Sequence, residues 1–428
     1  MPRPLSRVYH GWWIVLASML ALSVGGGVYW HGFGVFFLPL SREFSTSRAA
    51  LSGAVSISQL EGGLLGPVGG YLVDRYGPRR MMLVGSGVMG LGFLAMSQTH
   101  SIASFYVVFV LVISVGMSVG IRVPALVAPT NWFVRRRGTA VGLATSGSGL
   151  GGMLVPGLGL LIANVGWRAT SVVAAGLVWA VCLPAALLMR HPPERYGLLP
   201  DGDPPSPQPA TVPGGAAASP SPLSTAVASE AQFTLGAALR TPVFWLLSLS
   251  FGLRQLVVGA IGLHLVPYLE DVGIRPEVAA TALGVTAVAS ILGRLGFGWL
   301  ADRLEKRFVM AASMGMVAVG ALILPGVTQW WHLAGFVAFY SVGWGGGATL
   351  MFAVRADYFG RRAFGTISGM MDFVQMFGLV LGPLVAGLVF DAVGSYRPAF
   401  LTFAVSAAVA GSVMLFLRPP RTSPGQSA

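Results

Sequence analysis

Five charged side chains stand inside apolar stretches that are long enough to cross a lipid bilayer: Glu61, Arg122, Arg254, Arg294 and Asp372. A charge at that depth is costly, so such residues are expected to face a cavity or a partner of opposite charge. At 1.5 Å of helical rise per residue, all five lie about 12 to 21 Å from the basic end of their stretch. Three arginines against two carboxylates predict a midplane site that attracts an anion, and a guanidinium can bind a carboxylate through two parallel hydrogen bonds.

Neighbouring polar residues at helical spacing extend this site. Ser290 lies one turn before Arg294, and Gln375 lies three residues after Asp372. We therefore expect Arg294, Arg122, Arg254, Ser290 and Gln375 to bind substrate. The alternative is that the charges form structural ion pairs, which could not neutralise all three arginines.

Three residues could carry a proton through this site. Asp372 and Glu61 are carboxyls that could exchange partners between two conformations, and His31 belongs to the residue type that titrates near neutral pH. We expect coupling to use one of these three residues, with Asp372 the better candidate because Ser368 and Gln375 share its helix face. His31 also lies near the end of its stretch, where a histidine can be merely interfacial.

The composition indicates which elements hold these residues. The chain has 428 residues, of which 54% are hydrophobic and 10% charged, and its mean hydropathy is +0.72. This excludes a water-soluble globule, and continuous apolar runs of about 20 residues exclude a membrane β-barrel. The 59 glycines suit closely packed membrane helices. We predict an all-α membrane protein with twelve helices, over residues 12–38, 49–73, 81–98, 103–130, 138–163, 168–189, 242–268, 277–300, 308–326, 332–354, 364–390 and 396–417.

The basic residues fix an expected orientation. Nineteen of the 27 lysines and arginines fall on one side of the apolar runs, and by the positive-inside rule that side is cytosolic. We expect both termini there, in a multi-pass protein of the cytoplasmic membrane. Because this topology accounts for the net charge of +12, nucleic acid binding is unnecessary. The single cysteine, Cys182, excludes a disulfide framework and a cysteine-based metal site, and its place in an apolar run predicts a packing role.

The sequence contains an internal duplication. GYLVDRYGPRR at 70–80 recurs as GWLADRLEKR at 298–307, and WFVRRRGTAVG at 132–142 recurs as YFGRRAFGTISG at 358–369, at offsets of 226 to 228 residues. This predicts two six-helix bundles, 1–190 and 241–428, that face each other and can rock. Residues 191–240 between them are rich in Pro, Gly, Ala and Ser, which predicts a flexible cytosolic linker. GPVGG at 66–70 predicts tight helix packing.

The repeated G-x-L-x-D-R-x-G-x-R-R motif resembles the signature of the major facilitator superfamily of transporters. That resemblance implies a gate at the cytosolic mouth, where charges pair with neighbouring helices in one state and release them in another. The alternative is that these charges only set topology. The residues carried over to the gate are Asp74, Arg75, Arg79, Arg80, Asp302 and Arg303.

Three further stretches resemble the monocarboxylate transporter and oxalate–formate antiporter group: HGWWIVLAS, GVFFLPLSREF and the run that ends in WFVRRRGTAVGLATSGSGLGG. Arg294 stands eight residues before Asp302, where the resemblance implies an arginine that meets the substrate carboxylate. Ser290 departs from the animal members, which have an aspartate there, and His31 replaces their lysine. The departure at Ser290 puts the proton route of those members in doubt for this chain.

These observations predict a secondary active transporter of a small organic anion, a monocarboxylate or related carboxylate, that works by alternating access with proton symport or anion exchange. The first rival is efflux of drugs or amphipathic cations by proton antiport, which Glu61 and Asp372 would permit. The second is a non-transport membrane sensor on the same scaffold. We expect a monomer that has substrate, protons or a counter-anion, and lipid as partners. No enzyme, cofactor or metal motif is recognisable in the sequence.

Overall fold

A computed structural model describes residues 9–46, 48–190, 192–203 and 232–420 of the chain. In these residues the secondary structure is helical, without a strand. Ten helical segments are long and apolar enough to cross a membrane. One of the ten, Arg137–Leu188, contains two helices because its backbone turns at Gly166 with φ of 81°. The helix pair at 48–76 adds a further crossing, so the predicted all-α fold with twelve membrane helices is confirmed.

Irregular segments interrupt the first bundle at mid-depth. The first crossing and the fourth crossing change from α-helical to π-helical geometry near Tyr29 and Ser118, a change often found at functional sites. The elements of this bundle are α1 (His10–Gly26), η1 (Gly27–His31), α2 (Phe33–Glu43), α3 (Arg48–Leu64), α4 (Gly66–Tyr76), α5 (Pro78–Ser97), α6 (Ile102–Val108), η2 (Phe109–Ser114), η3 (Gly116–Arg122), α7 (Val123–Trp132), α8 (Arg137–Leu150), η4 (Gly151–Leu154) and α9 (Val155–Leu188).

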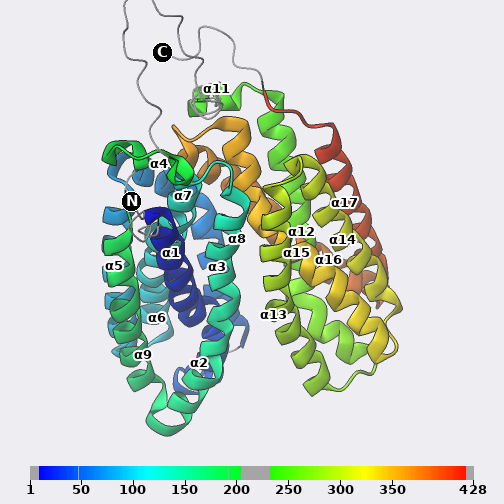
Figure 1. Cartoon of the computed structure of the whole chain (residues 1–428). Coiled ribbons are helices and arrows are strands. Elements are labelled where there is room, and N and C mark those ends of the chain that lie inside the picture. The colour runs from blue at the N-terminus through cyan, green and yellow to red at the C-terminus, as the bar shows by residue number, and fades with distance from the viewer. Residues whose placement is uncertain (1–8, 47, 191, 204–231, 421–428) are drawn as a thin grey trace, which may run out of the picture.

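The second bundle is built from longer uninterrupted helices. Proline begins several of them at the first turn, where its missing N–H would have no partner in any case. The elements are α11 (Leu235–Leu239), α12 (Pro242–Asp271), α13 (Pro276–Ala301), α14 (Lys306–Ile323), α15 (Trp330–Phe359), α16 (Phe364–Val393) and α17 (Arg397–Phe416). Figure 1 shows the two bundles side by side.

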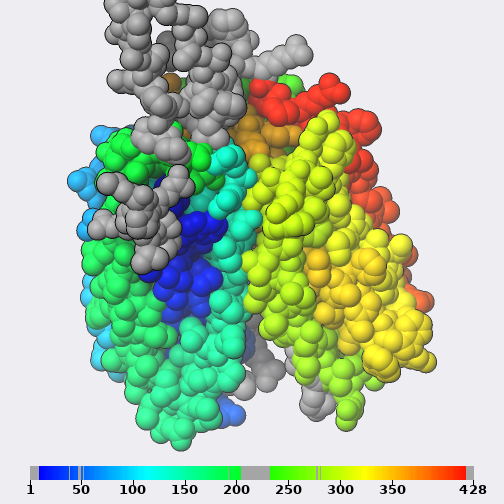
Figure 2. Space-filling view, in the orientation of Figure 1, coloured from blue at the N-terminus to red at the C-terminus, as the bar shows by residue number. Residues whose placement is uncertain are grey.

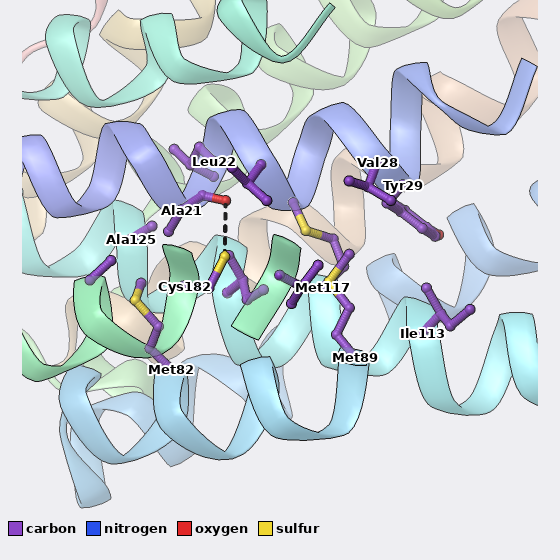
Figure 3. Packing of buried hydrophobic residues seen from close by; sticks show 14 of the residues in the cluster. Ala21, Leu22, Val28, Tyr29, Met82, Met89, Ile113, Met117, Ala125 and Cys182 are labelled. Carbon is purple, nitrogen blue, oxygen red and sulfur yellow. Dashed lines mark hydrogen bonds between the residues drawn. The ribbon is translucent and has the colours of Figure 1, made fainter. Parts of the chain in front are cut away.

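Each bundle has its own hydrophobic core. The core of the first bundle joins α1, α5, α9 and the fourth crossing, and Figure 3 shows Cys182 inside it among Met82, Met89 and Met117. The Cys182 thiol is buried and donates to the carbonyl of Ala21 at 3.9 Å, which agrees with the predicted packing role. Two clusters occupy the second bundle.

The bundles touch through glycines at the end of the molecule where α1 begins and α17 ends, which we call the terminal end (Figure 1). Gly70 lies against the backbone of Gly365, and Gly66 lies against Gly369. A methyl group at any of these positions would collide with backbone atoms, so α4 and α16 can approach this closely only because both present glycine. The prediction that GPVGG serves helix packing agrees with these contacts. Toward the opposite end the two halves separate (Figures 1 and 2).

The predicted flexible linker is docked at both of its ends. Asp201 accepts hydrogen bonds from the backbone N–H groups of Val134, Arg135 and Arg136 at 2.9 to 3.1 Å. Gln232 accepts one from the N–H of Arg362 at 3.0 Å, in the repeat-related turn of the second half. Within the predicted linker of 191–240, Asp201 and Gln232 are thus hydrogen-bonded to the bundles. Composition does not reveal such single capping side chains. Its Pro-rich middle, 204–231, lies outside the described residues.

Candidate functional site

A cavity of about 350 Å³ lies between the two bundles. Its polar lining includes Ser58 and Gln59 on α3 and the charged residues Arg122, Arg254 and Asp372. Much of the remaining lining is aromatic or sulfur-containing. The cavity is lined by Tyr29, Trp30, Ser58, Gln59, Gly62, Gly63, Ser114, Met117, Ser118, Arg122, Arg254, Gln255, Val258, Trp344, Ala348, Met351, Phe352, Asp372, Gln375, Met376 and Leu379.

Asp372 on α16 is held by three groups. Arg355 Nη2 donates to its carboxylate at 2.8 Å, Arg122 Nη2 donates from the other bundle at 3.4 Å, and Gln375 Nε2 donates at 3.3 Å. Arg355 is fully buried, and its guanidinium lies over the rings of Phe251 and Phe352. The Asp372 carboxylate is therefore clamped between two guanidinium groups, and it links the two bundles through Arg122.

Glu61 on α3 has a different environment. Ser114 and Ser118 of the fourth crossing donate hydroxyl hydrogen bonds to its two carboxylate oxygens, and Tyr29 Oη donates to Ser114 at 3.0 Å. Among the residues that the structure describes, no Lys, Arg or His lies within 4 Å of the Glu61 carboxylate. Arg122 pairs with Asp372 and not with Glu61, so the alternative of structural ion pairs does not hold for Glu61.

Arg254 on α12 is buried in the cavity wall and has no acidic partner among the described residues. Its Nη1 donates to the amide oxygen of Gln255 at 2.8 Å, and its Nη2 donates to the carbonyl of Trp344 at 2.6 Å. Its Nε has no acceptor. Neutral oxygens thus occupy positions around this guanidinium that a carboxylate could fill with much stronger hydrogen bonds.

Arg294 and Ser290 lie on α13, behind the cavity wall. Arg294 Nη1 donates to the carbonyl of Thr145 on α8 at 3.0 Å, and its guanidinium lies 5.8 Å from the centre of the Trp344 ring. Ser290 donates to Ala287 on its own helix. Neither residue lines the cavity in this conformation, contrary to the expectation for both. α13 turns this face toward α8 and α15.

His31 and His264 both contact backbone carbonyl groups. His31 Nε2 lies 3.0 Å from the carbonyl oxygen of Ser148, and His31 is outside the cavity lining. His264 contacts the carbonyl of Pro383 and the hydroxyl of Tyr396. His31 therefore joins α8 to the first crossing and is not in contact with the polar centre.

The two repeated aspartates connect the bundles at the terminal end. Asp74, at the end of α4, accepts hydrogen bonds from the N–H groups of Gly365 and Thr366 at 3.0 and 2.8 Å, in the first turn of α16. Asp302, after α13, does the same with Gly138 and Thr139 of α8 at 2.7 and 2.9 Å. Each carboxylate thus binds the N-terminus of a helix in the opposite bundle, where unpaired N–H groups favour an anion.

Basic residues of the repeated motifs divide into two groups. Arg137 of the first bundle binds Asp357 of the second, and Arg361 of the second donates to the carbonyl of Asn131 at 2.9 Å. Among the described residues, four of the expected gate residues form no hydrogen bond or ion pair with the opposite bundle: Arg75 donates to Tyr71 Oη and Arg303 to the Trp299 carbonyl on their own helices, and Arg79 and Arg80 are exposed. In this conformation Asp74 and Asp302 form hydrogen bonds between the bundles, whereas these four arginines do not.

Sequence reasoning missed Arg355, Trp344 and Gln255. Arg355 was counted with the cytosolic loops because α15 was expected to end at 354, whereas it continues to Phe359. Gln255, adjacent to Arg254, was a signal that could have been noticed. Trp344 lies in an apolar run without a polar neighbour, so nothing in its pattern distinguishes it from a core residue.

The sequence profile of the Major Facilitator Superfamily matches residues 12–273 and 247–428. The chain belongs to this superfamily. Its members are membrane transporters, which confirms the expectation that the chain is a transporter and not an enzyme.

The relatives confirm the resemblance to the monocarboxylate transporter and oxalate–formate antiporter group. Human monocarboxylate transporter 11 is 28% identical over 99% of this chain and 86% of its own length. Monocarboxylate transporter 12-B of Danio rerio is 26% identical over 95% of this chain and 87% of its own length. The oxalate:formate antiporter of Oxalobacter formigenes is 25% identical over 95% of this chain and 91% of its own length.

Solved structures show the same fold. A Major Facilitator Superfamily transporter, FucP, in the outward conformation superposes with a TM-score of 0.70 at 18% identity, covering 95% of this chain and 98% of that one. The human organic anion transporter TETRAN superposes with a TM-score of 0.62 at 16% identity, covering 95% and 98%.

Proposed function

We propose that this protein is a secondary transporter of a small organic anion, a carboxylate, which binds at Arg254 and crosses the membrane by alternating access. The observation that carries the proposal is a buried guanidinium in the cavity wall whose described neighbours include no acid. A charge buried without a counter-ion is costly, and an anionic ligand would remove that cost. The relation to monocarboxylate transporters supports the same substrate class.

The charge balance of the central region supports an anion over a cation. Among the described residues, this region holds four arginines and two carboxylates, those of Glu61 and Asp372; the arginines are Arg122, Arg254, Arg294 and Arg355. The region is therefore positive even when both acids are ionised, and it would repel an amphipathic cation. This argues against drug efflux by proton antiport. A non-transport sensor lacks support from any described feature.

We further propose that the terminal end is cytosolic, because the basic residues concentrate there, and that this structure is the outward-open state in the cytoplasmic membrane. Asp74 and Asp302 then close the cytosolic gate. When the bundles rock apart at this end, Arg294 loses the carbonyl of Thr145 on the opposite bundle. It would then need a new acceptor, so a substrate carboxylate bound to Arg254 could be shared with it during the change of state.

Glu61 is the better candidate for proton coupling. A proton on Asp372 would break two ion pairs, whereas Glu61 can take one up while keeping its serine partners. This revises the preference for Asp372. The contact of Glu61 with Tyr29 through Ser114 connects it to the cavity lining, and this supports proton symport over anion exchange.

Proteoliposomes that contain a pH-sensitive dye test the coupling. Carboxylate uptake by the wild type should acidify the lumen. In Glu61→Gln, proton movement should be lost while exchange down a gradient remains. If His31→Gln abolishes proton movement and Glu61→Gln does not, the carrier is the histidine. If carboxylate uptake by the wild type moves no protons, the mechanism is anion exchange and not proton symport.

A thermal-shift screen of the purified protein tests the substrate class. Mono- and dicarboxylates are compared with cationic dyes, because a ligand that binds the folded state raises the melting temperature. We expect stabilisation by carboxylates in the wild type and in Arg418→Gln, an exposed control, and none in Arg254→Gln. Stabilisation by cations alone would overturn the proposal.

A further inference from the structure

We propose that the substrate is a monocarboxylate with a bulky aromatic or apolar body, and that short acids and dicarboxylates are poor ligands. This inference rests on the proposed function, and it concerns the chemistry of the cavity around Arg254. Two observations carry it: the number of cations that are free to bind an anion, and the nature of the remaining wall.

A single guanidinium is available in the described cavity wall. Arg122 and Arg355 are both engaged with Asp372, at 3.4 and 2.8 Å, and Arg294 lies behind Trp344, outside the lining. Of the arginines that line the described cavity, Arg254 is the one whose hydrogen-bond acceptors are all neutral. A second carboxylate on the ligand would therefore have to break the Asp372 cluster or remain unpaired in the cavity, and both are costly.

Beside this anchor, apolar side chains form one part of the cavity lining, which we call the apolar wall. Trp344 is the apolar residue in direct contact with the anchor, because Arg254 donates to its carbonyl at 2.6 Å and Trp344 also lines the cavity. Aromatic rings favour stacked or edge-on contact with another ring, and methionines adapt to irregular apolar shapes and contact ring edges through sulfur. The apolar lining residues are contributed by both bundles: Trp30, Met117, Val258, Trp344, Met351, Phe352, Met376 and Leu379.

The size of the cavity agrees with such a ligand. Its volume of about 350 Å³ lies in the range of sites that bury a drug-sized molecule, roughly 300 to 1,000 Å³. A two-carbon acid bound to Arg254 would leave the apolar wall in contact with water. Each methylene group of a longer ligand that is buried against this wall should tighten binding by about fourfold.

The test is a calorimetric titration of the purified full-length protein with four compounds: acetate, oxalate, hydrocinnamate and the neutral hydrocinnamamide. We expect the dissociation constant of hydrocinnamate to be at least about tenfold lower than those of acetate and oxalate. We expect no measurable binding of hydrocinnamamide, because it has the ring without the charge that Arg254 requires.

Two cavity variants locate the apolar contact. Trp344→Leu and Trp30→Leu come from opposite bundles, and Trp30 is 42% exposed. Each should weaken hydrocinnamate by about threefold to tenfold and leave acetate unchanged. Phe377→Leu is the matched control, because Phe377 neighbours Met376 on α16 but is 53% exposed and lies outside the cavity lining.

The possible failures are distinguishable. If oxalate or acetate binds as tightly as hydrocinnamate, the inference about the apolar body is wrong while the proposed carboxylate function stands. If hydrocinnamamide binds as tightly as hydrocinnamate, or if no carboxylate binds, the proposed function itself fails. If both tryptophan variants bind hydrocinnamate like the wild type, the apolar wall is not the contact surface and the inference is overturned.

Discussion

Replacing Asp74 by asparagine should open the gate at the terminal end. The Asp74 carboxylate accepts hydrogen bonds at 2.8 to 3.0 Å from the N–H groups of Gly365 and Thr366 and from the Thr366 hydroxyl. A hydrogen bond to a charged acceptor is worth about 1 kcal/mol more than one to a neutral acceptor. Including the interaction with the N-terminus of α16, Asp74→Asn should cost the closed state about 2 to 3 kcal/mol. This shifts the equilibrium toward the opposite state by about 30-fold to 150-fold.

Cysteine labelling measures this shift. Cys182 is buried, so the background is low, and a reporter can be placed at Val127, which is 3% exposed and packs with Phe364 of the other bundle. Asp74→Asn should speed maleimide labelling of Val127→Cys and slow that of Trp30→Cys at the cavity. Substrate binding should change little by comparison.

The matched control for this prediction is Arg75→Gln. Arg75 is exposed at the same helix end and donates only to Tyr71 of its own helix among the described contacts. It should leave both labelling rates unchanged. An unchanged rate at Val127→Cys in Asp74→Asn would refute the gate. Faster labelling at both reporters would mean local unfolding instead of a change of state.

Three further changes have defined expected outcomes. Arg294→Lys should abolish most uptake at normal membrane expression, because lysine keeps the charge but loses the planar fork that binds Thr145 and could receive a carboxylate; wild-type uptake would argue for a structural role. Asp372→Asn should lower the melting temperature more than Glu61→Gln does, because it leaves the buried guanidinium of Arg355 and the half-buried one of Arg122 without their anion; equal melting temperatures would contradict the assigned clamp. Asp201→Ala should lower the stability by about 1 to 3 kcal/mol and Asp201→Asn by less, since alanine removes both acceptor oxygens of the three backbone N–H groups whereas asparagine keeps one; identical unfolding curves would show that the docked linker end contributes nothing.

The fold was predictable from the sequence because each crossing is a continuous apolar run and the two halves repeat. The side chains that line the cavity were only partly predictable. Arg254, Arg122, Asp372 and Gln375 were identified from charge and depth, and all four line the cavity. Arg294 has the same depth but a different direction. In a membrane helix the faces toward lipid and toward neighbouring helices are both apolar, so no periodicity in α13 indicates which face meets the cavity.

The partners of each charge were harder to predict than their positions. Arg122 was expected to bind substrate, with structural ion pairing as the alternative, and in the structure it reaches Asp372 across the cavity. This pairing depends on how the two bundles are packed at the terminal end, where Gly70 meets Gly365. Pairing between bundles is a property of one conformation, and a single sequence does not specify which conformation is adopted.

The most direct test of the account is the affinity of Arg254→Gln for the tightest-binding carboxylate of the thermal-shift screen. Loss of the charge-assisted hydrogen bonds from the guanidinium should raise the dissociation constant by about tenfold to a hundredfold or more, at unchanged affinity in Arg418→Gln. An Arg254→Gln protein that is folded and binds the carboxylate as tightly as the wild type would contradict the assignment of Arg254 as the anion-binding residue.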